Sequence, residues 1–77
     1  WSDLGNWASL YDKLNPDQFG NCIIGNAKMY DCKDCIVHAE DADLIILQGL
    51  DRFIVSVKDG NLLVCKRSEE QRIMDFL

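Results

Sequence analysis

Long apolar runs and an excess of positive charge are both missing from this sequence of 77 residues. No stretch approaches the ~20 apolar residues that a membrane-spanning helix needs, and no signal-peptide pattern leads the chain. Eight basic residues stand against thirteen acidic ones, which gives a net charge of −5. Nucleic acid and acidic membrane surfaces are disfavoured as partners, because the long-range field repels polyanions. We expect a soluble, cytoplasmic protein.

The sequence also lacks the parts of a self-contained active site. Its glycines are isolated, so there is no Gly-rich loop to hold phosphates. His38 is the only histidine, which excludes most multi-histidine metal sites, and no nucleophile can be identified beside it. The acidic residues Glu40, Asp41 and Asp43 fail the spacing of a helix-loop-helix calcium site, and we interpret them as a solvated turn. The pattern alone therefore assigns no catalytic and no cofactor-binding residue.

Four cysteines, an even number in a small domain, leave several interpretations open. Cys32 and Cys35 have the two-residue gap of a zinc or redox pair, but the remaining cysteines and His38 do not form a second close pair. A disulfide framework is disfavoured because nothing else in the sequence is typical of secretion. We expect reduced, partly buried thiols.

The two ends of the chain predict helices. Apolar residues recur every three or four positions from Trp1 to Leu14, and Asn15-Pro16 ends that pattern. Near the other end, Ser68 with Gln71 three residues later fits a capping box. An apolar stripe that packs on the preceding strands or on a neighbouring subunit follows it: Ile73, Met74 and Leu77.

The middle of the chain predicts about six short strands, because short apolar runs alternate with turn residues. The runs are 22–24, 27–30, 35–37, 44–47, 53–57 and 62–65. The run 44–47 is apolar at every position, which suggests a strand covered on both faces. The fold class is therefore mainly β with flanking helices.

Asp59-Gly60 predicts a two-residue hairpin turn. In that hairpin Val57 faces Leu62 and Val55 faces Val64, which makes one continuous apolar face. On the other face Ile54 meets Cys65 and Ser56 meets Leu63, so that side should be at least half buried.

Two segments resemble a known enzyme family. WSDLGNW, residues 1–7, is similar to the W-S-D-x-G-x-W signature of mannose-1-phosphate guanylyltransferases. Residues 43–71, DLIILQGLDRFIVSVKDGNLLVCKRSEEQ, are similar to the C-terminal region of that family. The resemblance implies the C-terminal part of an enzyme that makes GDP-mannose from GTP and mannose 1-phosphate.

The resemblance also implies the division of the chain and its one site residue. Residues 1–16 would end the catalytic domain, and residues 17–77 would form a short β-helix-like module that contributes to a homodimer. Asp3 would be a magnesium ligand in the parent enzyme, with Gly5 permitting close backbone approach; within the fragment alone, Asp3 is better explained as a helix N-cap. The chain opens on Trp1 rather than Met, so we expect it to be cut from a longer polypeptide and to be inactive alone.

Two alternatives remain open at this stage. One is a related nucleotidyltransferase that uses another sugar phosphate, because no sugar-recognition residue is identified in the chain. The other is a non-enzymatic binding or interaction module in which residues 1–7 are only part of an amphipathic helix.

Overall fold

The computed structural model describes residues 15–76, so the helix predicted for residues 1–14 lies outside the described part. Six strands and two short helical segments fill that range. They are β1 (Cys22–Gly25), β2 (Ala27–Tyr30), β3 (Ile36–Ala39), β4 (Ile45–Gln48), β5 (Phe53–Lys58), β6 (Asn61–Lys66), the 3₁₀ helix η2 (Arg67–Arg72) and α2 (Ile73–Phe76). The expected strands are all present, with bounds within about two residues of the predicted ones. Neither helix in residues 15–76 is long and apolar enough to span a membrane.

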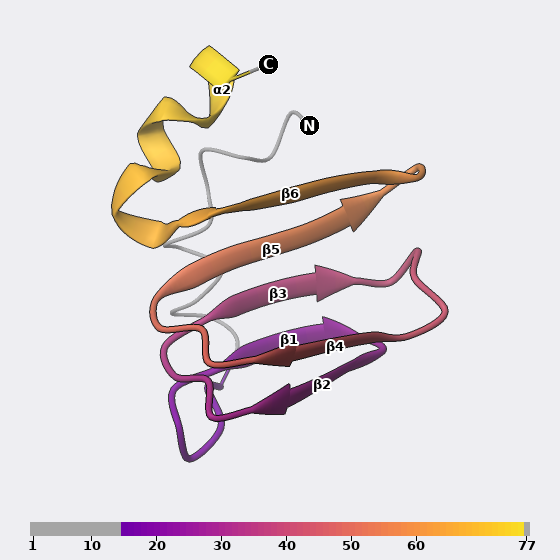
Figure 1. Ribbon diagram of the computed structural model, residues 1–77, viewed down its shortest axis with the longest axis vertical. Coiled ribbons are helices and arrows are strands. Elements are labelled where there is room, and N and C mark those ends of the chain that lie inside the picture. The colour runs from indigo at the N-terminus through magenta and orange to yellow at the C-terminus, as the bar shows by residue number, and fades with distance from the viewer. Residues whose placement is uncertain (1–14, 77) are drawn as a thin grey trace.

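The chain winds between two sheets (Figure 1). Strands β1, β3 and β5 lie side by side in parallel in the first sheet, with Cys22, Ile36 and Ile54 at equivalent positions. Strands β2 and β4 pair in parallel in the second sheet, where Ala27 is opposite Ile45. Each crossing from the first sheet to the second therefore adds one strand to each layer.

The winding ends at the predicted hairpin. Strand β5 turns back at Asp59 and Gly60, both with positive φ, and β6 pairs with it antiparallel. The predicted register is confirmed, since Val57 pairs with Leu62 and Ile54 with Cys65. A third strand of the second sheet is consequently absent from the described residues, and the first sheet has four strands against two.

The two faces of the hairpin differ in burial. On one face Ile54, Ser56 and Leu63 are buried, as predicted. On the other face only the β5 side is covered, because Val55 is 1% exposed whereas Leu62 is 66% and Val64 is 49% exposed. The continuous apolar face expected from the sequence is therefore present, but half of it meets solvent.

The prediction that residues 44–47 form a strand covered on both faces is wrong. The side chains of β4 alternate between half-buried and exposed, and Ile46 is 61% exposed. Its partner on β2, Lys28, is exposed as well. Only the inward residues Ile45 and Leu47 pack on the core, so the second sheet is covered on one face alone.

The core consists of two clusters, one on each side of the first sheet. Between the sheets, Val37, Ala39 and Val55 pack with Cys32 and Cys35, against side chains from β2 and β4. Behind the first sheet, Ile36, Ile54 and Leu63 pack around Ile73. Ile73 is buried against these strands, as predicted for the C-terminal apolar stripe; Met74 and Leu77, the other residues of that stripe, lie outside the side chains described.

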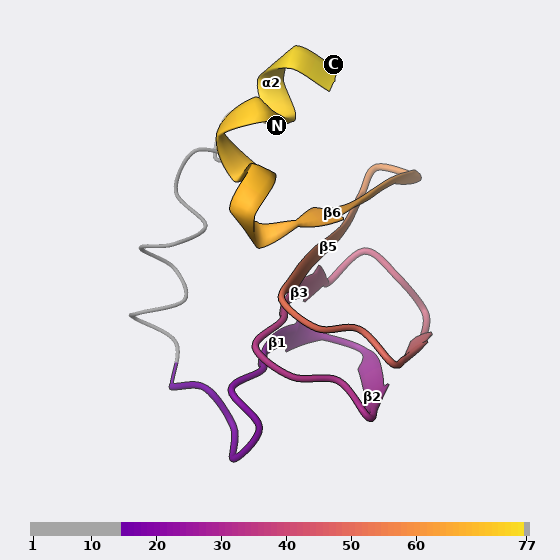
Figure 2. The same ribbon diagram turned by 60° about the vertical axis from the view of Figure 1, so that its left-hand side comes forward.

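The capping box predicted at Ser68 and Gln71 is wrong. The helical segment begins one residue earlier, at Arg67, after Lys66 in an extended conformation, and no side chain caps it. Its first part is a 3₁₀ helix, which leads into the single turn of α2. Both segments lie at the β6 end of the molecule, opposite β2 (Figures 1 and 2).

Candidate functional site

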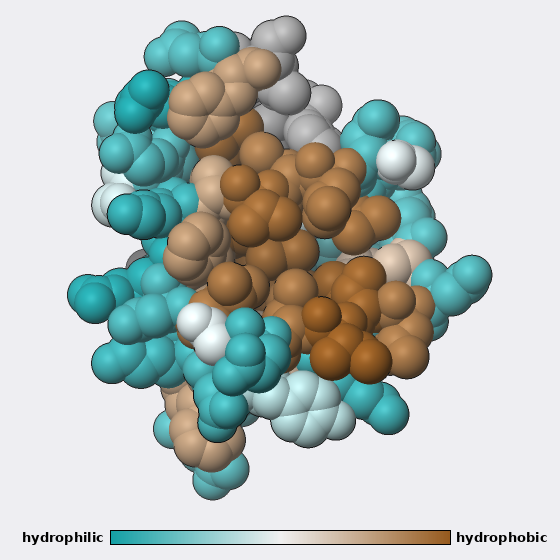
Figure 3. Space-filling view, viewed as in Figure 1, coloured by the Kyte–Doolittle hydropathy of each residue, from teal (hydrophilic) through white to brown (hydrophobic). Residues whose placement is uncertain are grey.

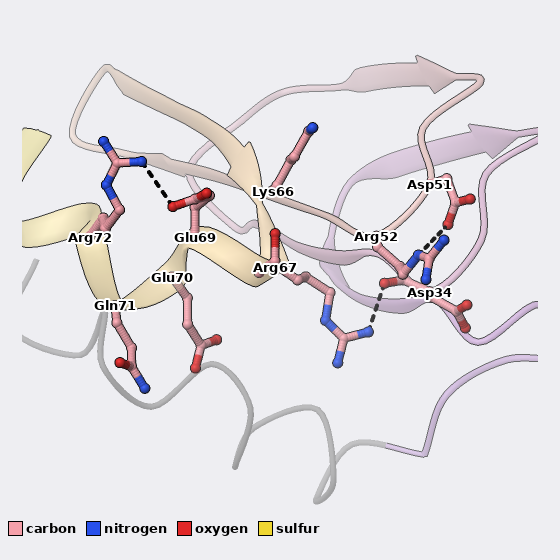
Figure 4. Close-up of a pocket in the computed structure, with 10 residues that line it drawn as sticks. Asp34, Asp51, Arg52, Lys66, Arg67, Glu69, Glu70, Gln71 and Arg72 are labelled. Carbon is pink, nitrogen blue, oxygen red and sulfur yellow. Dashed lines mark hydrogen bonds and ion pairs between the residues drawn. The ribbon is translucent and has the colours of Figure 1, made fainter.

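Asp3, the one site residue expected from the sequence, and Gly5 beside it lie outside the described residues. Within residues 15–76, a groove of about 820 Å³ lies between η2, the base of the hairpin and two turns of the winding chain (Figure 4).

Charged side chains dominate this groove. Its four basic residues are balanced by four acidic ones: Arg52, Lys66, Arg67 and Arg72 against Asp34, Asp51, Glu69 and Glu70. The ends of β6 and η2 bring Lys66 and Arg67 to the turns before β3 and β5. Sequence reasoning missed the groove because Asp34 and Arg67 are distant in the chain and share no motif.

Three of the basic side chains in the groove form hydrogen bonds or ion pairs with neighbouring groups. Arg67 donates from Nη1 to the backbone oxygen of Asp34 at 2.8 Å. Arg52 donates from Nε to Oδ1 of Asp51 at 3.1 Å, and Arg72 donates from Nη1 to Oε2 of Glu69 at 3.0 Å. The two exposed ion pairs, Arg52–Asp51 and Arg72–Glu69, contribute about 0–1 kcal/mol each, so they organise the surface more than they stabilise it.

Phosphate chemistry needs an excess of positive charge or a cradle of backbone amides. Here the opposing charges cancel, and the groove lining includes no histidine or cysteine. Ser68 is the sole hydroxyl among the residues that line the groove, and it is exposed. The groove is thus a charged junction between segments, and its lining contains no nucleophile paired with a base of the kind that covalent catalysis uses.

His38 and the acidic turn that follows β3 make contacts of a structural kind. The Nε2 atom of His38 is 3.9 Å from Oε1 of Glu40, and the imidazole side chain is 32% exposed. Asp41 accepts a hydrogen bond through Oδ2 from the backbone N–H of Asp59 at 3.1 Å. The turn after β3 is thereby tied to the tip of the hairpin.

None of the four cysteines forms a disulfide, and Cys22, Cys32 and Cys35 are buried. The thiol of Cys32 donates to the backbone oxygens of Tyr30 and Leu47 at 3.3 and 3.6 Å. The thiol of Cys35 donates to those of Lys33 and Leu50 at 3.3 and 3.5 Å. Each thiol therefore links its own turn to the next one, which is a packing role.

Burial raises the pKa of the Cys35 thiol, and the backbone N–H groups of Phe53 and Arg52 offset part of that rise. Burial also raises the pKa of Cys65, where Glu70 and Glu69 add to the effect. Thiolates are consequently disfavoured at neutral pH, which is the opposite of what a redox or nucleophilic cysteine needs. In residues 15–76 no three side chains of metal-ligating type converge on a common point.

The relatives of the chain are informative about its family, whereas the groove and the thiols are not. No family model matches the chain. The mannose-1-phosphate guanylyltransferase RfbM of Salmonella typhimurium is 34% identical over all of this chain. The chain is homologous, over its whole length, to one segment of the mannose-1-phosphate guanylyltransferases. A second enzyme of that name, from Klebsiella pneumoniae, is 32% identical over 95% of the chain.

Other relatives extend this result. The alginate biosynthesis protein AlgA of Pseudomonas syringae pv. tomato is 27% identical over the whole chain. The chain spans about 16% of the length of RfbM and of AlgA, so it corresponds to one segment of such proteins. A crystal structure described as a mannose-1-phosphate geranyltransferase, from Thermus thermophilus, matches 96% of the chain with a TM-score of 0.77. The match covers 22% of that structure at 21% identity, which establishes a shared fold.

Proposed function

We propose that this chain is the C-terminal part of a nucleotidyltransferase that makes GDP-mannose from GTP and mannose 1-phosphate. The observation that carries this is the match to RfbM, 34% identical over the full chain. The groove and the thiols of residues 15–76 offer no competing chemistry of their own. In this proposal the catalytic groups of the parent lie outside residues 15–76.

Residues 17–77 act in this proposal as a structural, oligomerising module. Parallel strands at equivalent positions in successive turns are the arrangement expected of a short β-helix-like module, and the hairpin closes it. The proposed partner is a second copy of the chain, in a cytoplasmic homodimer. Nucleic acid and membrane surfaces are not proposed partners, since the net charge of −5 repels polyanions.

Magnesium enters the proposal only through Asp3. A bound Mg²⁺ would neutralise charge on the transferring phosphates, and it usually takes one or two protein carboxylates besides water and substrate oxygens. Residues 15–76 contain no converging set of acidic ligands. Asp3 would thus act together with groups from the rest of the parent and from the substrate.

The first test compares the 77-residue chain with the longer polypeptide that contains it. Both are mixed with GTP, mannose 1-phosphate and MgCl₂, and released pyrophosphate is measured. We expect turnover by the longer protein and none by this chain. Pyrophosphate release by the isolated chain would contradict the proposed inactivity, and failure of the longer protein to use GTP would overturn the enzyme assignment.

Two further experiments test the role of Asp3 and the identity of the sugar. In the longer protein, Asp3→Asn should lower kcat/KM by about 10²-fold or more, since a lost metal ligand weakens charge stabilisation in the transition state. Asp17→Asn, which changes a carboxylate in the described turn, is the matched control and should leave kcat/KM within about twofold. Replacing mannose 1-phosphate by glucose 1-phosphate tests the alternative of another sugar; a preference for glucose would support that alternative.

A further inference from the structure

The β5–β6 hairpin closes on the only Asp-Gly pair of the 77-residue sequence, which contains no Asn-Gly pair. Asp59 and Gly60 form its two-residue turn, with φ of +52° and +79°. Both residues are exposed. Figures 1 and 3 share one view, in which the tip of the hairpin stands at the edge of the molecule with hydrophilic residues around it. Water therefore reaches the turn.

The backbone nitrogen that follows an aspartate can attack the side chain of that aspartate. An N–Cγ bond forms and a Cγ–Oδ bond breaks, and the departing oxygen takes the carboxyl proton and the amide proton to leave as water. The product is a five-membered succinimide ring. The attack requires a backbone N–H that is not held in a hydrogen bond, and space beside it, which is greatest when the second residue is glycine.

The turn at Asp59 and Gly60 meets both requirements. No hydrogen bond in residues 15–76 uses the backbone N–H of Gly60. A Cβ added at Gly60 would have no heavy atom within 4 Å, so the space around this residue is open. The positive φ of Asp59 is a conformation that disfavours a residue with a Cβ, so the fold holds Asp59 there only weakly.

Two other aspartates show the opposite arrangement. The N–H of Arg52, which follows Asp51, donates to the backbone oxygen of Lys33 at 2.9 Å. The N–H of Ala42, which follows Asp41, donates to the backbone oxygen three residues earlier at 3.2 Å. In both cases the nitrogen that would attack is held in place by the turn, and its residue carries a side chain.

We propose that Asp59-Gly60 is a site of spontaneous modification, at which aspartate in the folded chain becomes isoaspartate. Water opens the succinimide by adding to the main-chain carbonyl carbon of Asp59, and the bond from that carbon to the Gly60 nitrogen breaks. The chain then continues through Cγ. One water is lost and one is gained, so the mass is unchanged and no enzyme, oxidant or cofactor takes part. This inference is independent of the proposed enzymatic role.

The modification alters the hairpin because isoaspartate adds one atom to the backbone of the turn. The length of a two-residue loop sets the register of the strands that it joins. The pairs nearest the tip, Lys58 with Asn61 and Val57 with Leu62, should therefore lose their alignment first. The module would thus acquire a frayed hairpin as it ages.

One contact restrains the tip. The N–H of Asp59 donates to Oδ2 of Asp41 at 3.1 Å, and this bond is exposed. Asp41→Ala removes the acceptor, so it should raise the rate of isoaspartate formation by about two- to tenfold, as the loss of one net hydrogen bond would. Because Asp41 is exposed, the variant should keep the fold, which circular dichroism checks.

The experiment stores the 77-residue chain for weeks in mildly acidic buffer, with and without urea. Samples are digested with an endoproteinase that cuts before aspartate but not before isoaspartate, and the peptides are measured by mass spectrometry. In the folded chain, conversion at Asp59 should be within about tenfold of its rate in urea, since a hairpin tip opens locally at little cost. At Asp51 folding should suppress conversion far more, because the Arg52 N–H is freed only when the turns separate.

Asp59→Glu is the matched control, because it keeps the charge but would have to form a six-membered ring, which closes much more slowly. Isoaspartate at Asp59 of the folded wild-type chain, without the corresponding product in Asp59→Glu, supports the proposal. A folded chain that stays unmodified while the chain in urea reacts overturns it, since the turn would then protect the bond. Equal conversion at Asp51 and Asp59, or no conversion in either condition, overturns it as well.

Discussion

The side chain of Asn21 and the backbone of Cys35 are joined by a buried hydrogen bond of 3.0 Å from the Cys35 N–H to Oδ1. The two residues are neighbours at the base of the first sheet, one position before the paired residues Cys22 and Ile36. The Nδ2 atom of Asn21 also donates to the backbone oxygen of Cys32 at 3.0 Å. One amide thus satisfies two backbone groups of the next turn, which is why a polar residue that is only 3% exposed is tolerated there.

Asn21→Leu should destabilise the chain by about 2–4 kcal/mol, because a similar volume is kept while the Cys35 N–H and the Cys32 oxygen lose their partner. Urea denaturation followed by circular dichroism measures the loss. Asn26→Leu is the matched control, since the Asn26 amide contacts the Ala42 oxygen at 3.4 Å at an exposed position. It should cost under about 1 kcal/mol. Equal losses in the two variants would show that the buried amide has no special role.

Gly25 and Gly60 both have positive φ, at +96° and +79°, but they differ in the space around them. A Cβ on Gly25 would lie 2.4 Å from the backbone carbon of Ala39, whereas nothing is within 4 Å at Gly60. Gly60→Ala should cost about 1–2 kcal/mol from backbone strain alone. Gly25→Ala should cost about 1–3 kcal/mol more, because the adjacent turn must move. If thermal melts show both variants equally destabilised, close approach of the turns is not what Gly25 provides.

The strands and the hairpin could be predicted from the sequence because their signals are local. Asp59-Gly60 favours positive φ at two successive residues, and this alone fixed the register of β5 and β6. The face of β4 could not be predicted in the same way. An apolar run such as 45–47 does not say whether a second layer covers it, since that depends on where the winding stops.

The candidate site was still less accessible to sequence reasoning. Asp34 and Arg67 meet only because η2 begins at Arg67, against a turn 33 residues earlier. The capping-box pattern at Ser68 failed because the extended Lys66 leads directly into a 3₁₀ turn at Arg67, so Ser68 lies inside the helical segment and not at its N-cap. The family signature at residues 1–7 lies outside the described residues, and its assignment rests on resemblance.

Thiol reactivity provides a test of the packing of the turns. Cys65 is half-buried, whereas Cys22, Cys32 and Cys35 are at most 5% exposed. We expect one thiol per chain to react first with a maleimide, and the other three to be slower by roughly 10³-fold, because they react only after opening. Cys65→Ser should remove the fast phase, which mass spectrometry of the labelled chain would show. Early labelling of Cys32 or Cys35 would contradict their place in the core.

The stability of the folded chain should fall at alkaline pH, because its buried thiols resist ionisation. Burial is the main cause of the raised pKa of Cys22, Cys35 and Cys65. An unfolded thiol releases its proton near pH 8.5, so above that pH the folded state holds more protons than the unfolded state. The thiols' contribution to the free energy of unfolding is therefore fully present below about pH 8.5. It is lost as the pH rises toward the folded pKa, by up to ~1.4 kcal/mol per pH unit for each thiol.

Urea titrations between about pH 7.5 and 9.5 measure this slope. The Cys35→Ala variant leaves a cavity, so it should be less stable at every pH. Its slope should nevertheless be shallower than that of the wild type, because one titrating thiol is removed from the core. Equal slopes would mean that Cys35 ionises as readily in the folded chain as in the unfolded one, and its hydrogen bonds to the Lys33 and Leu50 oxygens would then not hold its proton.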